Sequence, residues 1–312
     1  MTKVLVTGAA GYVGARLART LARDGVHVRA LVRRRLPWLD IDDVVAAELD
    51  DASGAVAAAC AGVDAVVHLA APNEAVAACH PEGAFTETAL GARRMVMAAA
   101  AAGVPRFVYV STVHVYGAAA FEGAVLGEDV VPRPRDAYAV ARLAGEHLTS
   151  TVDGVDTVVV RLTNCVGAPA HPSVERWTLV VNDLCRQGAV RGHLRLRTHG
   201  LQWRDFLSME DACRLLAACT ARERVPAGTY NLGSGQPTTV RELAEMVRDA
   251  FEELTDRRPP LDAPDPPDEP PKPHFVDIGR LAALGLRATG DLRSAVAETA
   301  QFCQQHRDEL AG

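Results

Sequence analysis

The stretch VLVTGAAGYVGARLARTLARDG (Val4–Gly25) decides the fold. It joins a short apolar strand to an amphipathic helix through a turn with Gly8, Gly11 and Gly14 in the spacing G-x-x-G-x-x-G. Glycines there allow a tight turn and let a pyrophosphate approach the backbone N–H groups at the start of the helix. The spacing alone is weak evidence, but together with the strand before it and the helix after it the spacing predicts a dinucleotide-binding turn. A plain glycine turn between strand and helix is the alternative.

Further apolar runs alternate with helical patterns along the first half of the chain. The runs expected to be buried parallel strands are Lys3–Gly8, His27–Val32, Asp43–Leu49, Asp64–Ala71, Arg106–Thr112 and Asp156–Leu162. Alternation of this kind predicts an α/β fold, a Rossmann-type doubly wound parallel sheet. We place this dinucleotide-binding domain, with its catalytic residues, at 1–167.

The pattern loosens after residue 167. We expect a smaller C-terminal α/β lobe at 168–312, mainly substrate-binding, with some chain returning to the first domain. Its expected helices lie near Val174–Gln187, Met209–Ala221, Val240–Leu254 and Leu292–Gln305. Proline at high density precludes helix and central strand, so Pro259–Pro273 is expected to be an extended surface loop.

Composition excludes several classes of function. The chain has 312 residues, a formal net charge of −6 and 48% hydrophobic residues, which is typical of soluble globular proteins and unfavourable for general nucleic-acid binding. Seven cysteines and no Cys-x-x-Cys predict neither a disulfide framework nor a metal site, and indicate reduced thiols in a cytoplasmic protein. No signal-peptide pattern and no uncharged apolar run of about 18 residues occurs, so no membrane association is expected.

The end of the second predicted strand bears on the choice of cofactor. An acidic residue there would bind the adenosine ribose of NAD, but the chain has Arg33, Arg34 and Arg35 instead. A guanidinium favours a 2′-phosphate, which favours NADP over NAD. A solvated basic turn is the alternative. The tract from Glu48 to Asp51 ends the third strand, where the adenine should lie.

Seven segments in order resemble the extended short-chain dehydrogenases/reductases, in particular their nucleotide-sugar epimerases, dehydratases and ketoreductases. The segments are TGAAGYVG (7–14), DAVVHLAA (64–71), FVYVSTVHVYG (107–117), YAVAR (138–142), VVRLTNCVG (159–167), GLQWRDFLSMEDA (200–212) and GTYNLGSGQPTTVRELA (228–244). The resemblance implies NADP or NAD as cofactor and a nucleotide-diphosphate sugar as substrate. The implied cofactor-binding residues are Gly8, Gly11, Tyr12, Val13, Gly14, Arg33, Arg34, Glu48, Leu49, Leu69, Ala70, Ala71, Tyr138 and Arg142.

The resemblance also assigns the chemistry. Thr112 matches the family's catalytic Ser/Thr, and Tyr138 matches the general acid or base that moves a proton as hydride passes to or from nicotinamide. Arg142 is the third catalytic residue, and it stands where the family usually has a lysine. The implied substrate contacts are Thr112, His114, Asn164 and Arg204, the last because a diphosphate requires a fixed cation. A surface ion pair with Asp205 is the alternative for Arg204.

Three departures from the family pattern qualify this interpretation. Arg142 keeps the positive charge but is bulkier than lysine, and Thr88 replaces an asparagine that supports proton transfer. Val113 and His114 stand where the family's dehydratases carry Asp-Glu, which makes a dehydratase the less expected reaction. His114 is either a proton donor near the sugar or a structural histidine.

Three functions remain open. A 4-ketoreductase using NADPH is favoured by the arginines after the second strand, and a 4-epimerase with retained NAD is the alternative. A non-catalytic nucleotide-sugar or dinucleotide-binding protein is the third, motivated by Arg142 and Thr88. A homodimer is expected through helices near 84–102 and 136–150.

Overall fold

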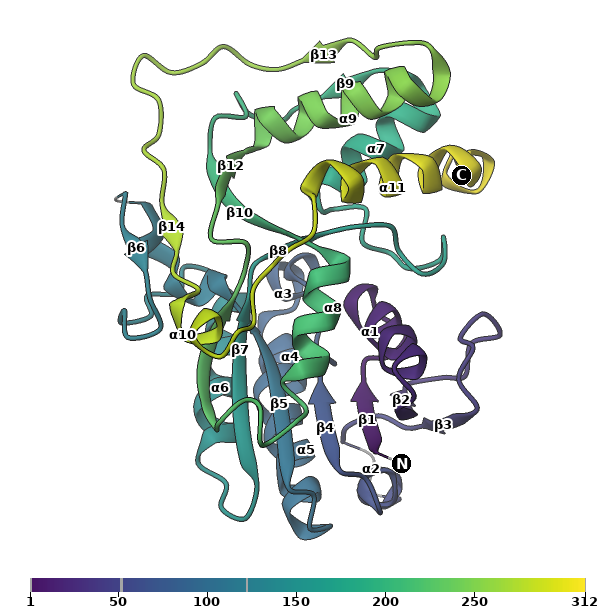
Figure 1. Cartoon of the computed structure of the whole chain (residues 1–312), viewed down its shortest axis with the longest axis vertical. Helices are drawn as coiled ribbons and strands as arrows, with labels where there is room; N and C mark the ends of the chain where they lie inside the picture. The colour runs from purple at the N-terminus through teal and green to yellow at the C-terminus, as the bar shows by residue number, and fades with distance from the viewer. Residues whose placement is uncertain (1, 51–52, 122, 312) are drawn as a thin grey trace.

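The computed structural model describes residues 2–50, 53–121 and 123–311. Its centre is a seven-stranded sheet, in which all neighbours are parallel, in the order β11-β7-β5-β4-β1-β2-β3 (Figure 1). The strands are β1 (Lys3–Thr7), β2 (His27–Val32), β3 (Asp43–Ala46), β4 (Ala65–His68), β5 (Arg106–Thr112), β7 (Asp156–Leu162) and β11 (Gly228–Leu232). The strand order reverses beside β1, at the point where open α/β sheets bind ligands at their carboxyl edge.

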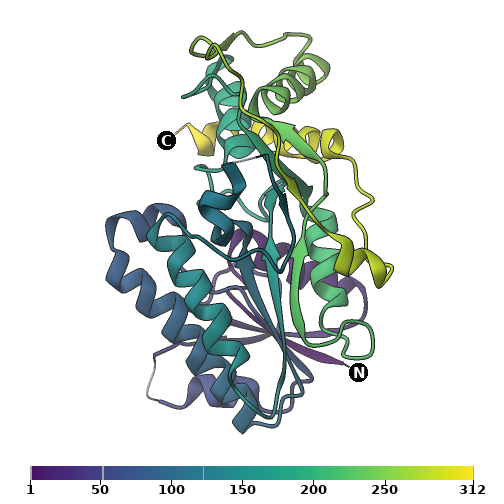
Figure 2. The same cartoon turned by 90° about the vertical axis from the view of Figure 1, so that its left-hand side faces the viewer.

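Helices cover both faces of this sheet because its strands are apolar on both sides. Val4 and Val6 face one hydrophobic cluster, while Leu5 between them faces another, as the alternation along a strand requires. On the first face lie α1 (Tyr12–Arg23) and α8 (Met209–Ala218). On the second lie α2 (Ala55–Cys60), α3 (Glu74–Cys79), α4 (Pro81–Phe85), the π-helical turn η1 (Thr86–Leu90), α5 (Gly91–Ala101) and α6 (Ala137–Ser150) (Figure 2).

A second group of elements packs around its own hydrophobic cluster above the carboxyl edge of the sheet (Figure 1). Its helices are α7 (Val180–Arg191), α9 (Val240–Thr255), α11 (Leu292–Gln305) and α12 (Arg307–Leu310). A three-stranded sheet of β8 (Asn164–Val166), β10 (Trp203–Ser208) and β12 (Pro237–Thr239) leads into it. The short pairs are β9 (Leu194–Arg195) with β13 (Leu261–Asp262), and β6 (Val125–Leu126) with β14 (Phe275–Val276). The remaining elements are the 3₁₀ segment η2 (Val113–Phe121) and α10 (Gly279–Ala283).

The fold class predicted from the sequence is confirmed. Every apolar run named above forms a strand of the parallel sheet, and residues 259–273 contain no helix and only the two-residue strand β13. One feature differs in detail, since the first helix after residue 168 begins at Val180 rather than near 174. The strand β11 in the large sheet is chain from beyond residue 168, in line with the expectation that some of it returns to the first domain. The division at 167/168 stays a prediction.

The late start of α7 has a local cause. Residues 171–179 form turns in which the Ser173 backbone N–H donates to His171 Nδ1 at 3.2 Å. The carbonyl of Arg176 accepts from the Leu179 N–H at 3.3 Å, as in a tight turn, and from Asn182 Nδ2 at 3.1 Å. The helix then ends at Gly192, whose φ of +66° is the left-handed conformation that glycine adopts at helix ends.

Candidate functional site

The glycine turn is shaped for close approach of a ligand to the backbone. Gly8 has a φ of +68°, and a Cβ on it would lie 2.9 Å from the backbone nitrogen of Ala70. A Cβ on Gly14 would lie 2.1 Å from the Gly8 carbonyl oxygen, so α1 can begin against the turn only with glycine there. The N-cap Gly11 offers no side chain to the first N–H groups of α1, and the first turn has no acidic residue. This cradle fits a dinucleotide pyrophosphate.

Tyr12 and Val13 open the helix, but the Tyr12 side chain has a structural role. Its hydroxyl donates to the carbonyl of Gly167 at 2.6 Å and to Asn182 Oδ1 at 3.3 Å. Burial raises the pKa of Tyr12 far above its usual range. Only the backbone of Tyr12 can therefore serve the pyrophosphate, and Val13 packs against the core of the first face.

The adenosine end of the site is basic and open. Arg33 and Arg34 follow β2, are exposed, and make no hydrogen bond or ion pair with another residue that the structure describes. Arg35 is different, since its Nη2 donates to the Val44 carbonyl at 2.6 Å. Glu48 is exposed and Leu49 half-buried beside Gly91, while Asp51 lies outside the described residues.

The segment after β4 is tied to the glycine turn through Thr7. The Thr7 hydroxyl oxygen accepts from the backbone N–H groups of Leu69 and Ala70, each at 3.2 Å, and lies 2.8 Å from His68 Nδ1. The two N–H groups occupy the lone pairs of the Thr7 hydroxyl oxygen, so the hydroxyl donates its proton to His68 Nδ1. The neutral His68 ring then carries its own proton on Nε2. Burial, aided by Arg142, lowers the pKa of His68 to about 3, so the ring is neutral. Leu69, Ala70 and Ala71 are thus held half-buried along the crevice.

Thr112, His114 and Tyr138 come together where β5 ends and α6 begins. The His114 N–H donates to Thr112 Oγ1 at 3.2 Å, which leaves the hydroxyl proton of Thr112 available to a ligand. The rings of His114 and Tyr138 meet edge to face with centroids 6.5 Å apart. Asp136 caps α6 by accepting from the Ala139 N–H at 2.8 Å, and so sets where Tyr138 emerges.

Arg142 lies one helical turn below Tyr138 and is buried. Its Nη1 donates to the Val110 carbonyl at 2.8 Å, and its Cζ lies 5.3 Å from the centroid of the Tyr138 ring. Its Nε is buried with no partner among the residues that the structure describes. The guanidinium therefore places a fixed charge beside the Tyr138 ring. Close approach of α6 to β5 needs Gly145, where a Cβ would lie 2.2 Å from the hydroxyl of Tyr109.

Asn164 and Arg204 approach the same cleft from the three-stranded sheet. Asn164 Nδ2 donates to the Asp205 carbonyl at 2.9 Å. Arg204 is half-buried, donates to the Trp203 carbonyl at 2.7 Å, and has no carboxylate partner among the described residues. Burial lowers the pKa of Arg204. The proposed ion pair with Asp205 is wrong, because the Asp205 carboxylate is buried and accepts from the N–H groups of 234 and 235 at 2.9 and 2.7 Å.

His114 faces charges from several elements. It is open to solvent on one side, but loss of water on the others and the nearby Arg204 lower the pKa of His114. Asp136 and Glu74 act in the opposite direction. The ring is therefore neutral at neutral pH, and the role of His114 as proton donor or as structural histidine stays a prediction.

Two further groups at the cleft were missed by the sequence analysis. Glu74 begins α3 and pairs with Arg176 at 3.0 Å, which joins the two halves of the molecule across the cleft. His274 precedes β14, and burial together with Arg204 lowers the pKa of His274. Glu74 could have been noted as a residue that follows a strand at the carboxyl edge. His274 had no signal, because it follows an irregular proline-rich loop.

Thr88 lies in η1 and is buried. A π-helical turn in this position interrupts the α-helical ladder between α4 and α5, a feature often found near functional sites. Among the described residues, Arg142 is held by the Val110 carbonyl on β5 and by Tyr138 on its own helix rather than by Thr88. Thr88, in place of the family's asparagine, thus occurs together with a support for α6 that comes from the bond between Arg142 and the Val110 carbonyl.

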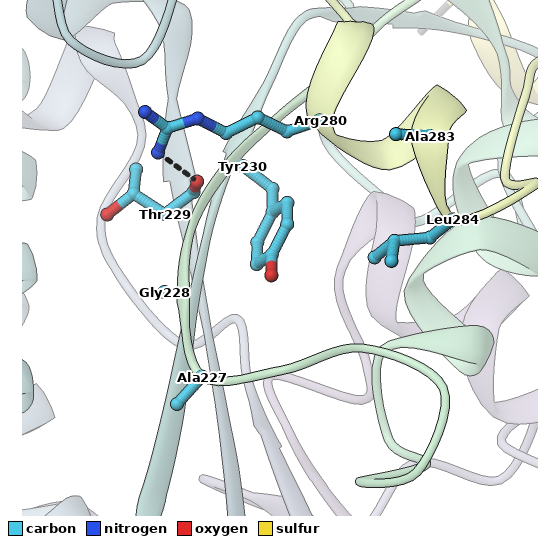
Figure 3. Close-up of a pocket in the computed structure, with 7 residues that line it drawn as sticks. All are labelled: Ala227, Gly228, Thr229, Tyr230, Arg280, Ala283 and Leu284. Atoms are coloured by element: carbon cyan, nitrogen blue, oxygen red, sulfur yellow. Dashed lines mark hydrogen bonds between the residues drawn. The ribbon is translucent and has the colours of Figure 1, made fainter.

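A separate hollow of about 360 Å³ lies on the edge strand β11, away from these residues (Figure 3). Arg280 reaches over it and donates to the Thr229 carbonyl at 3.4 Å. Its guanidinium is already paired with Asp129 at 2.6 Å and with Glu128 at 3.4 Å. This hollow therefore offers no unpaired charge, and Thr112 and Tyr138 do not line it.

Within the described residues, no cluster of His, Cys, Asp and Glu is arranged to hold a metal ion, and all seven cysteines are free thiols. No helix of the described chain is both long and apolar enough to cross a membrane.

The fold and site define a dinucleotide-dependent enzyme class, and comparison with known proteins agrees. The family model described as NAD dependent epimerase/dehydratase family matches residues 4–233, and the chain belongs to this family. The dTDP-glucose 4,6-dehydratase of Streptomyces griseus is 29% identical over 98% of this chain and 95% of its own length. The GDP-6-deoxy-D-mannose reductase of Pseudomonas aeruginosa is 29% identical over 79% of each chain. The structure of MoeE5 in complex with UDP-glucose and NAD is 26% identical with a TM-score of 0.81, covering 97% of this chain and 99% of its own.

Proposed function

We propose that this chain is an NAD(P)-dependent nucleotide-sugar oxidoreductase that transfers hydride at a sugar ring carbon, most simply the 4-position. The observation that carries the proposal is the half-buried guanidinium of Arg204, which has no carboxylate partner among the described residues and acts on His114, the neighbour of Tyr138. A fixed cation at this place suits the diphosphate of a nucleotide sugar. The sugar then lies against Thr112 and Tyr138.

Each residue has a role that follows from its contacts. The nicotinamide, when bound, supplies or accepts the hydride. The Thr112 hydroxyl donates a hydrogen bond to the sugar oxygen, and Tyr138 transfers the single proton to that oxygen or takes it from it. The Arg142 guanidinium places a fixed positive charge beside the Tyr138 ring, where it stabilises negative charge that develops as the proton moves. Arg204, Asn164 and His274 hold the diphosphate.

Net 4-ketoreduction with NADPH is the preferred reaction, and 4-epimerisation with retained NAD is the alternative. The exposed Arg33 and Arg34, which have no partner among the described residues, support NADPH. The test is the dinucleotide content of protein purified without added cofactor, measured by mass spectrometry after denaturation. An empty site that binds NADPH more tightly than NADH supports the ketoreductase. Retained NAD contradicts the NADP assignment and supports the epimerase, and a site that binds neither supports the non-catalytic alternative.

Elimination of water is a second candidate because dehydratases are prominent among the relatives. Val113 is half-buried against apolar neighbours and can move no proton. The groups available for an elimination are His114 and the Glu74 carboxylate, which act on each other across the cleft. Incubation of the NAD-loaded protein with nucleotide hexoses would reveal this reaction as a product lighter by one water.

A homodimer is part of the proposal. The helices α3 to α6 lie side by side on one flank (Figure 2) and expose apolar side chains there, with Met97 48% and Val140 44% exposed. Between α4 and α6 runs a groove of about 410 Å³ lined by Phe85 and Val140 among others. We expect Val140→Asp to give a monomer in sedimentation analysis. The matched variant Val131→Asp, at a more exposed site outside these helices, should stay a dimer, and a wild-type monomer would contradict this part of the proposal.

A further inference from the structure

A cluster of buried polar side chains lies directly behind the candidate catalytic residues. The Ser111 hydroxyl donates to Glu146 Oε1 at 2.5 Å. Arg161 donates to the same carboxylate from Nε, at 3.2 Å to each oxygen, and from Nη2 at 2.8 Å. Ser111, Glu146 and Arg161 are all 5% exposed or less. An ion pair this deeply buried is held by several hydrogen bonds on both partners.

The positions of these residues tie them to the site. Ser111 immediately precedes Thr112 on β5, and it is the register partner of Arg161 on β7. Glu146 follows Arg142 by four residues and Tyr138 by eight on α6, so all three lie on one face of the helix. The Glu146 carboxylate is thus clamped between two adjacent strands on the side from which Tyr138 and Arg142 project.

The cluster continues toward the substrate lobe. Arg161 Nη1 donates to the Tyr116 hydroxyl at 3.1 Å, and that hydroxyl donates to Asn231 Oδ1 at 2.7 Å. Asn231 Nδ2 donates to the carbonyls of Leu126 and Asp277, at 2.8 and 2.9 Å, and so fixes the strands β6 and β14. No polar side-chain atom of this cluster is buried without a partner in the described part of the chain.

Stability alone gives a weak reason for this arrangement. Replacing a buried ion pair by apolar residues of similar size is often neutral or stabilising, because both charges must lose their water. What an apolar contact does not supply is directional bonding that fixes how a helix is rotated against a strand. That rotation decides whether Tyr138 faces Thr112, and an error of about 1 Å in such a contact can lower a rate by roughly 100-fold.

We propose that Glu146 and Arg161 are positioning residues that hold α6 in catalytic register with β5. Their bonds fix the helix face that presents Tyr138 and Arg142 to Thr112. Neither residue touches the substrate. The kinetic test of this inference rests on the proposed function, whereas the spectroscopic test of the position of Tyr138 does not.

The test uses the full chain and the double variant Glu146→Met with Arg161→Met, which removes both charges and leaves no unpaired one. We expect this variant to keep its thermal midpoint and its affinity for the dinucleotide. Its kcat should fall about 100-fold with KM for the nucleotide sugar changed by a few-fold at most. The matched control is Glu245→Met with Arg248→Met, which removes an ion pair of 2.8 Å on α9 and should leave kcat unchanged.

Wild-type kcat in a stable double variant would overturn the proposal, since a merely structural pair is fully replaced by methionines. Should the double variant not fold, Glu146→Gln keeps an acceptor for Ser111 and loses the charge. Its kcat should then fall about 10-fold, and an unchanged kcat would overturn the proposal equally.

A second readout needs no turnover, so it separates failure of the inference from failure of the proposed function. The ring signal of Tyr138 in a tyrosine-labelled NMR spectrum is assigned by its loss in Tyr138→Phe. It should shift in the double variant, while that of Tyr12, on the far side of the sheet, should not. Superimposable Tyr138 signals would overturn the positioning role, whereas absence of turnover in the wild type would bear only on the proposed function.

Discussion

Replacing Arg142 by methionine removes the charge beside Tyr138 and keeps a side chain of similar length. The guanidinium carbon lies 5.3 Å from the centre of the Tyr138 ring, and Arg142 is only 8% exposed. Removing one fixed group that stabilises charge developing in a transition state costs about 3 kcal/mol. Since about 1.4 kcal/mol corresponds to a factor of ten, turnover at neutral pH should fall roughly 100-fold.

The assay follows nicotinamide absorbance with a nucleotide sugar that the wild-type protein converts, over a range of pH. Arg142→Lys is the matched control, since it keeps the charge and loses the bond to the Val110 carbonyl, and it should stay within about 10-fold of the wild type.

The reasoning is refuted if Arg142→Met turns over within about threefold of the wild type at neutral pH. Circular dichroism and dinucleotide binding of both variants would first establish that each one is folded.

Three other expectations concern binding and stability. Gly14→Ala places a methyl group 2.1 Å from the Gly8 carbonyl oxygen, so the turn must shift and the dinucleotide Kd should rise at least about 10-fold by calorimetry. Gly83→Ala, where a Cβ meets nothing within 4 Å, should leave that Kd unchanged. Arg204→Met should raise KM for the nucleotide sugar about 100-fold, the value of a charge-assisted contact, and leave dinucleotide affinity intact. His68, with its pKa lowered to about 3, takes up no proton in the folded state as the pH falls below about 6.5, whereas the unfolded chain does. By pH ~4.5 this should cost about 3 kcal/mol of unfolding free energy, and His68→Asn should remove that extra loss in denaturant titrations; equal losses in both proteins would contradict it.

The features that the sequence predicted well are those set by local sterics and by the strand pattern. Gly8 and Gly14 can be replaced by no other residue without a clash in the turn, and this is why their spacing is recognisable. The apolar runs specify buried strands, and parallel strands bring their carboxyl ends to one edge. Thr112 and the glycine turn therefore meet at that edge without further information.

The features that the sequence did not predict depend on contacts between distant segments. Arg161 follows three valines in β7, which indicates a buried partner but not that the partner is Glu146 on α6. His274 reaches Arg204 only because the proline-rich loop returns the chain to the cleft. The helix expected near 174 begins at Val180, because Asn182 holds the Arg176 carbonyl outside it.

The central claim is that Tyr138 moves the proton while hydride passes between the nicotinamide and a sugar. The most direct measurement is single-turnover hydride transfer by Tyr138→Phe and by the wild type, each saturated with dinucleotide and nucleotide sugar. The account predicts that the phenylalanine variant binds both ligands with wild-type affinity and transfers hydride at least about 100-fold more slowly. Hydride transfer at the wild-type rate in this variant would contradict the assignment of Tyr138.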